Sequence, residues 1–446
     1  MSPRTARPLA ALVTALALSA AAAPAQAASD PLLPEQWALS TPSATGAAEA
    51  WTQSRGNGVL VAVLDSGIDL DHPELAANLW TNPDEIAGNR IDDDRNGHVD
   101  DVHGANMISP GASVNDDEGH GTHVAGIVAA RAGNGAGGSG IAPGARLMAV
   151  KVLDANRSGN SSLLARGIRY AVDEGARILN VSLNGDGTSS DLDEALRYAD
   201  ARGATVVSSA GNNSRNLDLR PSYPASSPVS AVLSVTAFER TGNLLSVANR
   251  GLNSVDIAAP GGTILSTAMG SGYELRAGTS MAAPFVAGSL ALLAGARPDL
   301  PQPALREALT KTAAPSGLLA GLLGGGRLNV GAAMHRVLPG EMWGNAPTAA
   351  NAAATSAASV KLLANARVRA GRTATVRWRA SGATEVATWR VLLDGRRVGT
   401  VANGERSLLR KRVSATGRHR WKVVGLDAEG APVVSAARSF RVVSKG

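Results

Sequence analysis

The sequence predicts an α/β protein whose first domain is a doubly wound, mostly parallel sheet flanked by helices, followed by a small antiparallel β-sandwich. From Asp30 to about Leu338, short apolar runs rich in β-branched residues alternate with longer amphipathic stretches, which is typical of parallel strands covered by helices. Beyond residue 360 the apolar residues recur at every second position, as in antiparallel strands. These two periodicities predict the two domains.

The elements of the first domain follow from the same runs, in chain order. Strands are expected over Val59–Leu64, Leu147–Leu153, Ile178–Ser182, Thr205–Ser208, Val232–Val235 and Val255–Ala258. Helices are expected over His123–Ala132, Leu163–Glu174, Leu192–Ala201, Met281–Gly295 and Gln302–Thr312. In such sheets, ligands bind outside the carboxyl ends of the strands. Asp65, Ser182 and Asn212 lie at or just after the ends of predicted strands, so these side chains are candidates for the chemistry.

Residues 1–27 have the composition of an export signal. Arg4 and Arg7 give a basic start, Leu9–Ala23 is apolar, and Ala25-Gln26-Ala27 has the small-x-small form that signal peptidase cuts. A membrane anchor would need about 20 apolar residues, and this run is shorter and is followed at once by the cleavage pattern. We therefore expect a secreted, extracellular protein that begins at Ala28 and has no membrane span.

Charge is divided unevenly along the chain, and cysteine is absent. From Lys361 onward there are 19 basic and 5 acidic residues, whereas the rest of the chain holds 24 basic and 32 acidic residues. Two domains of opposite charge are expected. Without cysteine the chain can form neither a disulfide nor a lipid-anchoring thioester, so stability outside the cell has to come from the core or from bound metal.

The C-terminal part is predicted to be a linker, 345–359, and an accessory β-sandwich, 360–446. The linker consists of small and polar residues and carries no charge. In the sandwich, Thr373–Ala380 alternates strictly between apolar and polar residues, and Asp394-Gly395 supplies the positive φ of a two-residue hairpin. The core candidates are Trp378, Trp389 and Trp421.

Three local patterns offer the groups that peptide hydrolysis by a serine requires. The first is a buried strand that ends on Asp65; the second and third are His120-Gly121-Thr122-His123-Val124-Ala125-Gly126 and Gly278-Thr279-Ser280-Met281-Ala282-Ala283-Pro284. Serine is a weak nucleophile, so it needs an imidazole to take its proton and a carboxylate to hold that imidazole in the right tautomer. Ser280 opens a helix that is apolar on every side, and the positive end of its dipole favours a developing oxyanion.

These three patterns, in the order Asp, His, Ser, resemble the subtilase family, and the likeness covers roughly residues 36–329. The resemblance implies a subtilisin-like peptidase domain over 30–338 and a serine endopeptidase that works through an acyl-enzyme. Ser280 would attack, His120 would shuttle the proton and Asp65 would orient the imidazole. Neutral to alkaline pH would suit this reaction, because the base must be unprotonated and free imidazole titrates near about 6.5.

The resemblance also implies residues around these three groups. Asn212 would donate to the oxyanion together with the backbone N–H of Ser280. Two segments would pair with the substrate, and Ser222 would lie near the base of the primary pocket; the residues are Ser158, Gly159, Ser182, Leu183, Asn184 and Ser222. Asn184 stands where the family usually has glycine, and Arg157 lies at the lip of the first segment. Close approach and charge preference at these positions are therefore left open.

The stretch 92–101 has the spacing of a calcium loop. Oxygen-bearing side chains recur at alternate positions before a turn glycine, and His98 would offer its carbonyl rather than its ring; the candidate ligands are Asp92, Asp94, Asn96, His98, Asp100 and Asp101. The alternative is an acidic, solvated loop, which explains the Asn96-Gly97 register less well. Glu74 and Asn134 approximate a second calcium site of the family, although the Gly-rich run 133–140 departs from its pattern. Calcium is the only cofactor expected.

Two hypotheses of function remain open at this stage. The first is an extracellular, calcium-stabilised endopeptidase, a monomer that acts on proteins or peptides. The second is a secreted binding or adhesion protein on a protease scaffold, which the presence of all four catalytic groups disfavours. The C-terminal module resembles immunoglobulin-like or fibronectin-like modules. Its basic residues would keep a sheet edge soluble, hold an anionic surface or dock on the acidic first domain; no nucleic-acid module is recognised.

Overall fold

In a computed structural model, the chain divides into two compact units, Met1–Gly344 and Asn345–Gly446. The structure describes residues 30–338 and, in the second unit, 359–364, 367–369, 371–381, 388–393, 396–402, 408–413, 416–426 and 432–444. The predicted export signal, nearly all of the predicted linker and the Asp394-Gly395 turn lie outside these residues.

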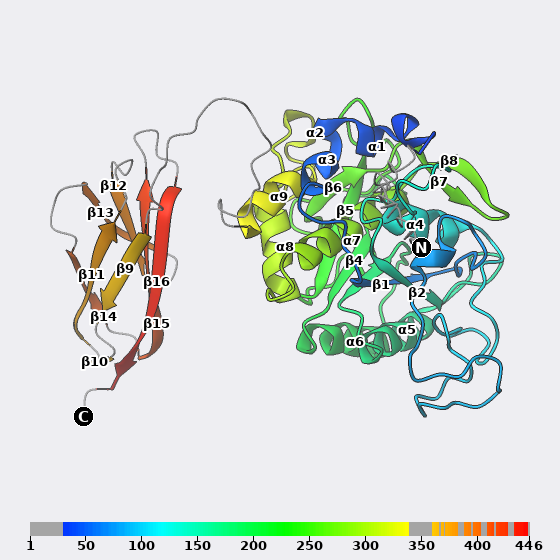
Figure 1. Cartoon of the computed structure of the whole chain (residues 1–446), viewed down its shortest axis with the longest axis horizontal. Helices are drawn as coiled ribbons and strands as arrows, with labels where there is room; N and C mark the ends of the chain where they lie inside the picture. Colours follow the sequence, from blue (N-terminus) through cyan, green and yellow to red (C-terminus); the bar gives the residue numbers. More distant parts are fainter. Residues whose placement is uncertain are drawn as a thin grey trace, which may run out of the picture. The chain divides into compact units, whose positions relative to one another are not determined.

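The first unit is built on a six-stranded parallel sheet, as predicted (Figure 1). The strand order is β2-β1-β3-β4-β5-β6, so the chain starts near one edge and crosses over once. The strands are β1 (Leu60–Asp65), β2 (Arg146–Lys151), β3 (Ile178–Val181), β4 (Thr205–Ser209), β5 (Val232–Phe238) and β6 (Ile257–Pro260). Each lies within a few residues of a predicted strand.

Helices cover both faces of this sheet because successive residues of a strand point to opposite sides. The main helices are α4 (His120–Ala129), α5 (Ser161–Asp173), α6 (Ser190–Ala201), α7 (Thr279–Ala296), α8 (Gln302–Lys311) and α9 (Val330–Val337). Val61 and Val63 of β1 pack in the core that contains α4 and α7. Ala62 and Leu64 pack in a second core with α5 and α6, on the other face (Figure 1).

The central helix α7 is the most apolar element, and its burial on every side was predicted. It is long and apolar enough to cross a membrane, but 78% of it is buried inside the protein. We therefore assign it to the core. Because α7 packs against β3, β4, β5 and β6, its first turn, which carries Ser280, is held over the sheet.

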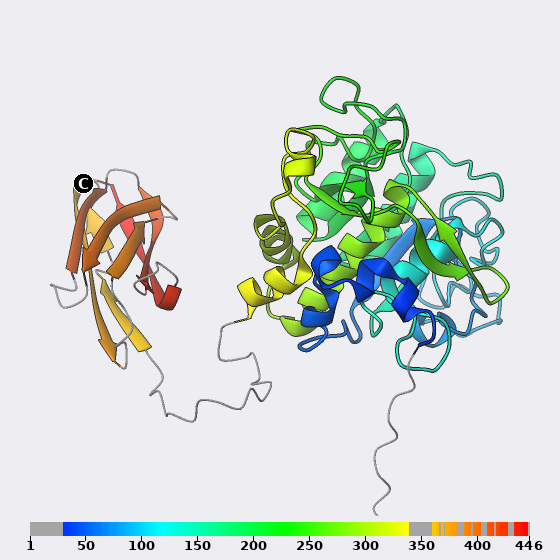
Figure 2. The same cartoon turned by 90° about the horizontal axis from the view of Figure 1, so that it is seen from above.

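Several short elements of the first unit carry no periodic signal in the sequence and were not predicted. They are α1 (Trp37–Ser40), α2 (Pro42–Thr45), α3 (Ala47–Ala50) and the hairpin of β7 (Ile264–Ala268) and β8 (Gly272–Arg276). Helix α9 was missed as well. Figure 2 shows the N-terminal helices beside α9, with which α3 is in contact. Helix α4 also ends at Ala129, three residues before the predicted end, because Ala130 leaves the helical conformation.

The second unit contains two small sheets, mostly antiparallel. One has the order β10-β16-β15-β12-β13 and the other β14-β11-β9. The strands are β9 (Ser359–Ala364), β10 (Arg367–Arg369), β11 (Arg372–Ser381), β12 (Thr388–Leu393), β13 (Arg396–Ala402), β14 (Leu408–Val413), β15 (Gly417–Leu426) and β16 (Pro432–Val443). The pair β10 and β16 is parallel.

The predicted alternation in β11 is present where its side chains are described. Ala374 and Val376 are buried, and Thr373, which precedes Ala374, is exposed. Trp389 and Trp421 are buried, as predicted for core residues, while the side chain of Trp378 lies outside the description. Leu393 of β12 pairs with Arg396 of β13, which is the register of the predicted two-residue hairpin.

Candidate active site

The three predicted catalytic groups come from elements that meet at one edge of the sheet. Asp65 is the last residue of β1, His120 is the first residue of α4, and Ser280 is the second residue of α7. His120 and Ser280 line the same cavity, which has a volume of about 320 Å³. Asp65 is fully buried behind His120.

A short hydrogen bond joins the carboxylate and the imidazole. His120 Nδ1 lies 2.7 Å from Asp65 Oδ1, and the same oxygen accepts the backbone N–H of Ser66 at 2.8 Å. The other carboxylate oxygen, Oδ2, is buried and has no hydrogen-bond partner in the described part of the chain. Because a carboxylate can only accept, this contact selects the tautomer with a proton on Nδ1. His120 Nε2 is then free to act as a base.

The Ser280 hydroxyl contacts the predicted substrate segment in this structure. Its Oγ donates to the carbonyl oxygen of Ser182 at 3.0 Å, and Ser182 Oγ donates back to the carbonyl oxygen of Ser280 at 2.8 Å. The Ser280 hydroxyl therefore has to leave the Ser182 carbonyl before it can donate to His120. Catalytic hydrogen bonds often tighten only when substrate is present, so this geometry is compatible with a nucleophile at rest.

Asn212 is oriented by the residue that precedes Ser280. Asn212 Oδ1 accepts from the backbone N–H of Thr279 at 2.9 Å and from its hydroxyl at 3.2 Å, an assignment that rests on the hydrogen-bond network. With the oxygen occupied, the amide NH₂ is left to donate. Gly278 lies close by at φ 147°, and a Cβ added to it would lie 3.1 Å from Asn212 Nδ2. Only glycine leaves this approach open.

Asp116 holds the start of α4, a role that we did not predict. Its Oδ1 accepts the N–H groups of Glu118 and Gly119, and its Oδ2 accepts the N–H and the hydroxyl of Thr122 at 2.9 and 2.6 Å. Burial alone would raise the pKa of Asp116, but these hydrogen bonds outweigh it and lower the pKa. Asp116 lies three residues before Gly119, the N-cap of α4, so the usual capping position in the sequence did not point to it.

Lys151 is a second positioning residue that we did not predict. It ends β2 beside Asp65 in the strand register, and its side chain is only 6% exposed. Its Nζ donates to the carbonyl oxygens of Ser66 and Leu153, at 2.5 and 3.0 Å, and to Asp117 Oδ1 at 2.7 Å. Lys151 thus ties the residue after β1 to the chain that follows β2 and to the loop before His120. A single lysine at the end of a strand does not by itself indicate these contacts, so the sequence could not predict them.

The cavity contains most of the predicted substrate-binding residues. Gly159, Ser182, Leu183 and Asn184 line it, together with Tyr223. Ser222 is buried beside it and donates to the carbonyl oxygen of Gly185 at 3.2 Å. Ser158 does not line the cavity; its backbone carbonyl and N–H instead close a turn with Asp154. The structure therefore brings four of the six predicted residues to the cavity wall.

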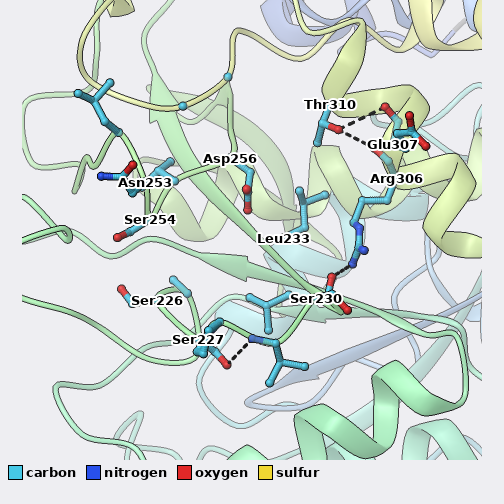
Figure 3. Close-up of a pocket in the computed structure, with 18 of the residues that line it drawn as sticks. Ser226, Ser227, Ser230, Leu233, Asn253, Ser254, Asp256, Arg306, Glu307 and Thr310 are labelled. Atoms are coloured by element: carbon cyan, nitrogen blue, oxygen red, sulfur yellow. Dashed lines mark hydrogen bonds between the residues drawn. The ribbon is translucent and has the colours of Figure 1, made fainter. Parts of the chain in front are cut away.

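A larger hollow lies elsewhere on the same unit and holds none of the three predicted catalytic groups. Figure 3 shows this cavity, of about 840 Å³, with Ser226, Asp256 and Arg306 among its lining residues. Arg306 donates to the carbonyl oxygen of Ser230 there. Cavity size alone would thus select a place without the predicted groups, and the chemistry of the lining residues makes the smaller cavity the candidate active site.

The predicted calcium loop gathers carboxylates from within and outside the stretch 92–101. Carboxylate oxygens of Glu85, Asp92 and Asp94 lie within 4.8 Å of one another, and so do those of Asp94, Asp101 and Glu174. Burial and the neighbouring carboxylates raise the pKa of Glu174. We did not predict Glu85 or Glu174, because they lie outside the loop motif and only folding brings them to it.

The amide nitrogen of Asn96, and not the oxygen predicted as a ligand, faces the second carboxylate group, while the oxygen accepts the backbone N–H of His98 at 2.8 Å. Asn96 Nδ2 lies 3.0 Å from Asp94 Oδ2, 2.9 Å from Asp101 Oδ2 and 3.1 Å from Glu174 Oε1. Glu85 Oε2 is buried without a partner in the described part of the chain. Oxygen ligands with unbalanced negative charge fit a hard cation.

Neither the Asp100 carboxylate nor the ring of His98 belongs to these two carboxylate groups. Asp100 Oδ2 accepts the backbone N–H of Arg90 at 3.0 Å, and the His98 ring packs edge-on against Tyr170 with centroids 4.9 Å apart. At the second predicted site, Asn134 Nδ2 lies 3.3 Å from Glu74 Oε1. Asp30, which we did not predict there, accepts the backbone N–H groups of Gly133 and Asn134.

Comparisons with known proteins point to one family of enzymes. The sequence matches the model of the subtilase family over residues 56–369. It is 38% identical over 274 residues to the intracellular serine protease of Paenibacillus polymyxa, covering 60% of this chain and 77% of that protein. It is 34% identical over 253 residues to thermitase of Thermoactinomyces vulgaris, covering 57% of this chain and 81% of that protein. A solved protease structure from Pseudoalteromonas arctica is similar with a TM-score of 0.59 and 28% identity, covering 70% of this chain and 100% of that one.

Proposed function

Because the chain belongs to the subtilase family and is a serine endopeptidase, we propose that it cleaves peptide bonds through an acyl-enzyme on Ser280. His120 is the general base and Asp65 orients it. The observation that carries this assignment is the 2.7 Å contact between His120 Nδ1 and Asp65 Oδ1, in a cavity that Ser280 also lines. A neutral imidazole that is held by a buried carboxylate and lies beside an accessible serine is the arrangement that makes a hydroxyl nucleophilic.

The reaction then proceeds in two halves. Ser280 Oγ attacks the carbonyl carbon of the scissile bond while its proton passes to His120 Nε2. The oxyanion that forms accepts hydrogen bonds from Asn212 Nδ2 and from the N–H of Ser280 at the start of α7. His120 next gives its proton to the departing amine as the C–N bond breaks. Water, deprotonated by His120, attacks the acyl-enzyme, releases the carboxylic acid and restores Ser280.

Digestion of casein by the purified protein, beside a Ser280→Ala variant, tests this assignment. The wild-type protein should release soluble peptides and the variant should lose activity by at least about 1,000-fold, since residual catalysis by binding and oxyanion stabilisation alone is small. A matched control is Ser289→Ala, which removes a hydroxyl bonded within the same helix, away from the cavity. Equal activity of the wild-type protein and Ser280→Ala would remove Ser280 from this role.

We further propose that calcium stabilises the protein through the loop 92–101, with Glu85 and Glu174 as additional ligands. The support is the convergence of five carboxylates there and the unpaired Glu85 Oε2. Calcium would act on stability, because Asp65, His120 and Ser280 supply the reacting groups themselves.

Secretion and the role of the second unit are also proposals. Residues 1–27 carry the export pattern, and the relatives include both an intracellular protease and thermitase. The second unit, with its excess of basic residues, would act as an immunoglobulin-like or fibronectin-like module that tethers the enzyme to an anionic surface. Its two small sheets and buried Trp389 and Trp421 support an independently folded module.

A further inference from the structure

We propose that Arg157 is a specificity-determining residue that makes the enzyme prefer substrates with an acidic side chain close to the scissile bond. This inference rests on the proposed function, because it assumes that substrate occupies the cavity of His120 and Ser280. Among the described residues that line this cavity, Arg157 is the only one with a permanently charged side chain. The other lining residues are apolar, glycine, or neutral and polar, so one cation dominates the electrostatics of the wall.

The backbone of the loop holds Arg157 in place. Asp154 Oδ1 accepts the N–H groups of Asn156 and Ser158, both at 2.8 Å, and the N–H of Arg157 bonds to the Asp154 carbonyl at 3.0 Å. These bonds close a tight turn in which Arg157 adopts φ 59°, in the left-handed region. Residues other than glycine are uncommon in this region, so the turn is somewhat strained with the long cationic side chain of Arg157 at this position.

Glu118 positions the guanidinium beside the catalytic histidine. Arg157 Nε donates to Glu118 Oε1 at 2.5 Å, and Glu118 Oε2 accepts the backbone N–H of His120 at 2.8 Å. The Glu118 side chain is 13% exposed and that of Arg157 is 52% exposed. The carboxylate is therefore turned inward and the guanidinium is turned toward solvent at the cavity wall.

The guanidinium keeps donors for a ligand. Of its nitrogens only Nε makes a hydrogen bond within the described part of the chain, so both terminal nitrogens remain available. Two terminal N–H groups can bind a carboxylate side by side, which a single ammonium cannot reproduce. Glu118 offsets part of the positive charge, and solvent screens the rest. We therefore expect kcat/KM to be about 5- to 10-fold higher for a substrate with an acidic side chain than for one with a neutral side chain. An effect of this size lies between that of an exposed ion pair and that of a buried one.

The test compares quenched fluorescent peptides that differ only by Glu or Gln at one position, for each of three positions on either side of the cleaved bond. The readout is the ratio of kcat/KM for the Glu peptide to that for the Gln peptide, measured with the full-length protein. For the wild-type protein we expect a ratio of about 5 to 10 at one position, falling as NaCl is added. For Arg157→Asn we expect a ratio near 1 that does not respond to salt; asparagine tolerates positive φ well.

Three further variants make the result specific. Arg157→Lys should keep part of the preference, since the charge remains but the paired donors are lost. Glu118→Gln should raise the ratio, because it removes the competing carboxylate while its amide oxygen can still accept the N–H of His120. Arg169→Gln removes the same charge from α5, where Arg169 pairs with Glu194 outside the cavity, and should leave the ratio at the wild-type value.

The outcomes separate this inference from the proposed function. If no peptide pair gives a ratio above 1, or if Arg157→Asn retains the wild-type ratio, the role of Arg157 is overturned although the enzyme cleaves the peptides. If the wild-type protein cleaves none of the peptides, or Ser280→Ala cleaves them equally well, the assignment of the active site itself fails.

Discussion

The side chain of Asn212, near the proposed nucleophile, is held by hydrogen bonds to its oxygen that leave its NH₂ group free to donate. Asn212 Oδ1 is bonded to the N–H and the hydroxyl of Thr279, and Thr279 Oγ1 in turn accepts the N–H of Gly211 at 2.9 Å. This chain of contacts fixes which end of the amide is left to donate. A donor that is oriented before the reaction stabilises the oxyanion without reorganisation.

Asn212→Ala should therefore lower kcat by about 100- to 1,000-fold and change KM little, because the lost bond forms in the transition state. Steady-state kinetics on one peptide measure both constants. The neighbouring Asn213→Ala is the control, since no hydrogen bond of the Asn213 side chain is seen and only its N–H is bonded, to Asn249. A loss confined to KM would mean that Asn212 binds substrate and not the transition state.

His123 is buried one helical turn after His120 and does not reach the cavity. Its Nε2 contacts the carbonyl oxygen of Glu274 at 3.2 Å, and Nδ1 has no partner in the described part of the chain. Burial lowers the pKa of His123 to about 4. Because the folded state resists protonation there, the unfolded chain takes up a proton at a higher pH than the folded protein does.

Acid should therefore destabilise the protein through His123 between about pH 6.5, where the unfolded imidazole titrates, and about pH 4. Between pH 7 and pH 4.5 the wild-type protein should lose about 2 kcal/mol more free energy of unfolding than His123→Gln does. Denaturant titrations at the two pH values measure this difference. Parallel losses in the two proteins would show that His123 does not titrate in this way.

Helix α4 and strand β1 bring His120 to Asp65 by close packing of backbones. A Cβ on Gly121 would lie 2.0 Å from the carbonyl oxygen of Gly67 and 3.2 Å from Asp65 Cβ, so no larger residue fits at this helix position. Gly121 N also donates to Ser66 Oγ at 2.9 Å. The distance between the carboxylate and the imidazole is thus set by how closely the helix approaches the strand end.

Gly121→Ala should push α4 away from β1, lower the free energy of unfolding by about 1–3 kcal/mol and reduce kcat/KM by more than about tenfold. Thermal unfolding and peptide kinetics give the two numbers. Gly317→Ala serves as the control, since a Cβ there meets nothing within 4 Å. Wild-type activity in Gly121→Ala would show that the helix has room to move without disturbing the catalytic pair.

The loop 92–101 has no regular secondary structure, so its order depends on its ligands and hydrogen bonds. Removing calcium with a chelator should lower Tm by roughly 5–10 °C, the effect of losing about 3 kcal/mol of binding free energy. Asp94→Asn should lower Tm in the presence of calcium and weaken the response to chelator. Glu194→Gln, an exposed change on α6, should behave as the wild-type protein does. An unchanged Tm in excess chelator would exclude this site.

The whole chain joins a predominantly acidic catalytic unit to a basic second unit, with 19 basic and 5 acidic residues from Lys361 onward. If the second unit tethers the enzyme, a chain that ends at Gly344 should keep its kcat/KM on short peptides and lose its retention on an anionic resin such as phosphocellulose. Retention of the full chain should fall as salt is added. Equal retention of both chains at every salt concentration would exclude the tethering role.

Local patterns predicted the elements of this protein better than they predicted its contacts. The long strands and helices were found because burial imposes a period on the sequence, whereas four-residue helices such as α1 are too short to show one. Asp65, His120 and Ser280 were found because each lies in a distinctive local motif. Lys151, Glu85 and Glu174 were missed because each acquires its role only from residues far along the chain.

The sequence by itself determined the fold class, the elements and the chemical groups available for catalysis, since these depend on the periodicity of burial and on residue type. Only the tertiary structure decided which carboxylate meets His120, which face of Asn212 is free, and that Arg157 stands alone as the charge on the cavity wall. Such contacts join residues far apart in the chain, and their distances follow from how helices pack against the sheet and not from any local preference.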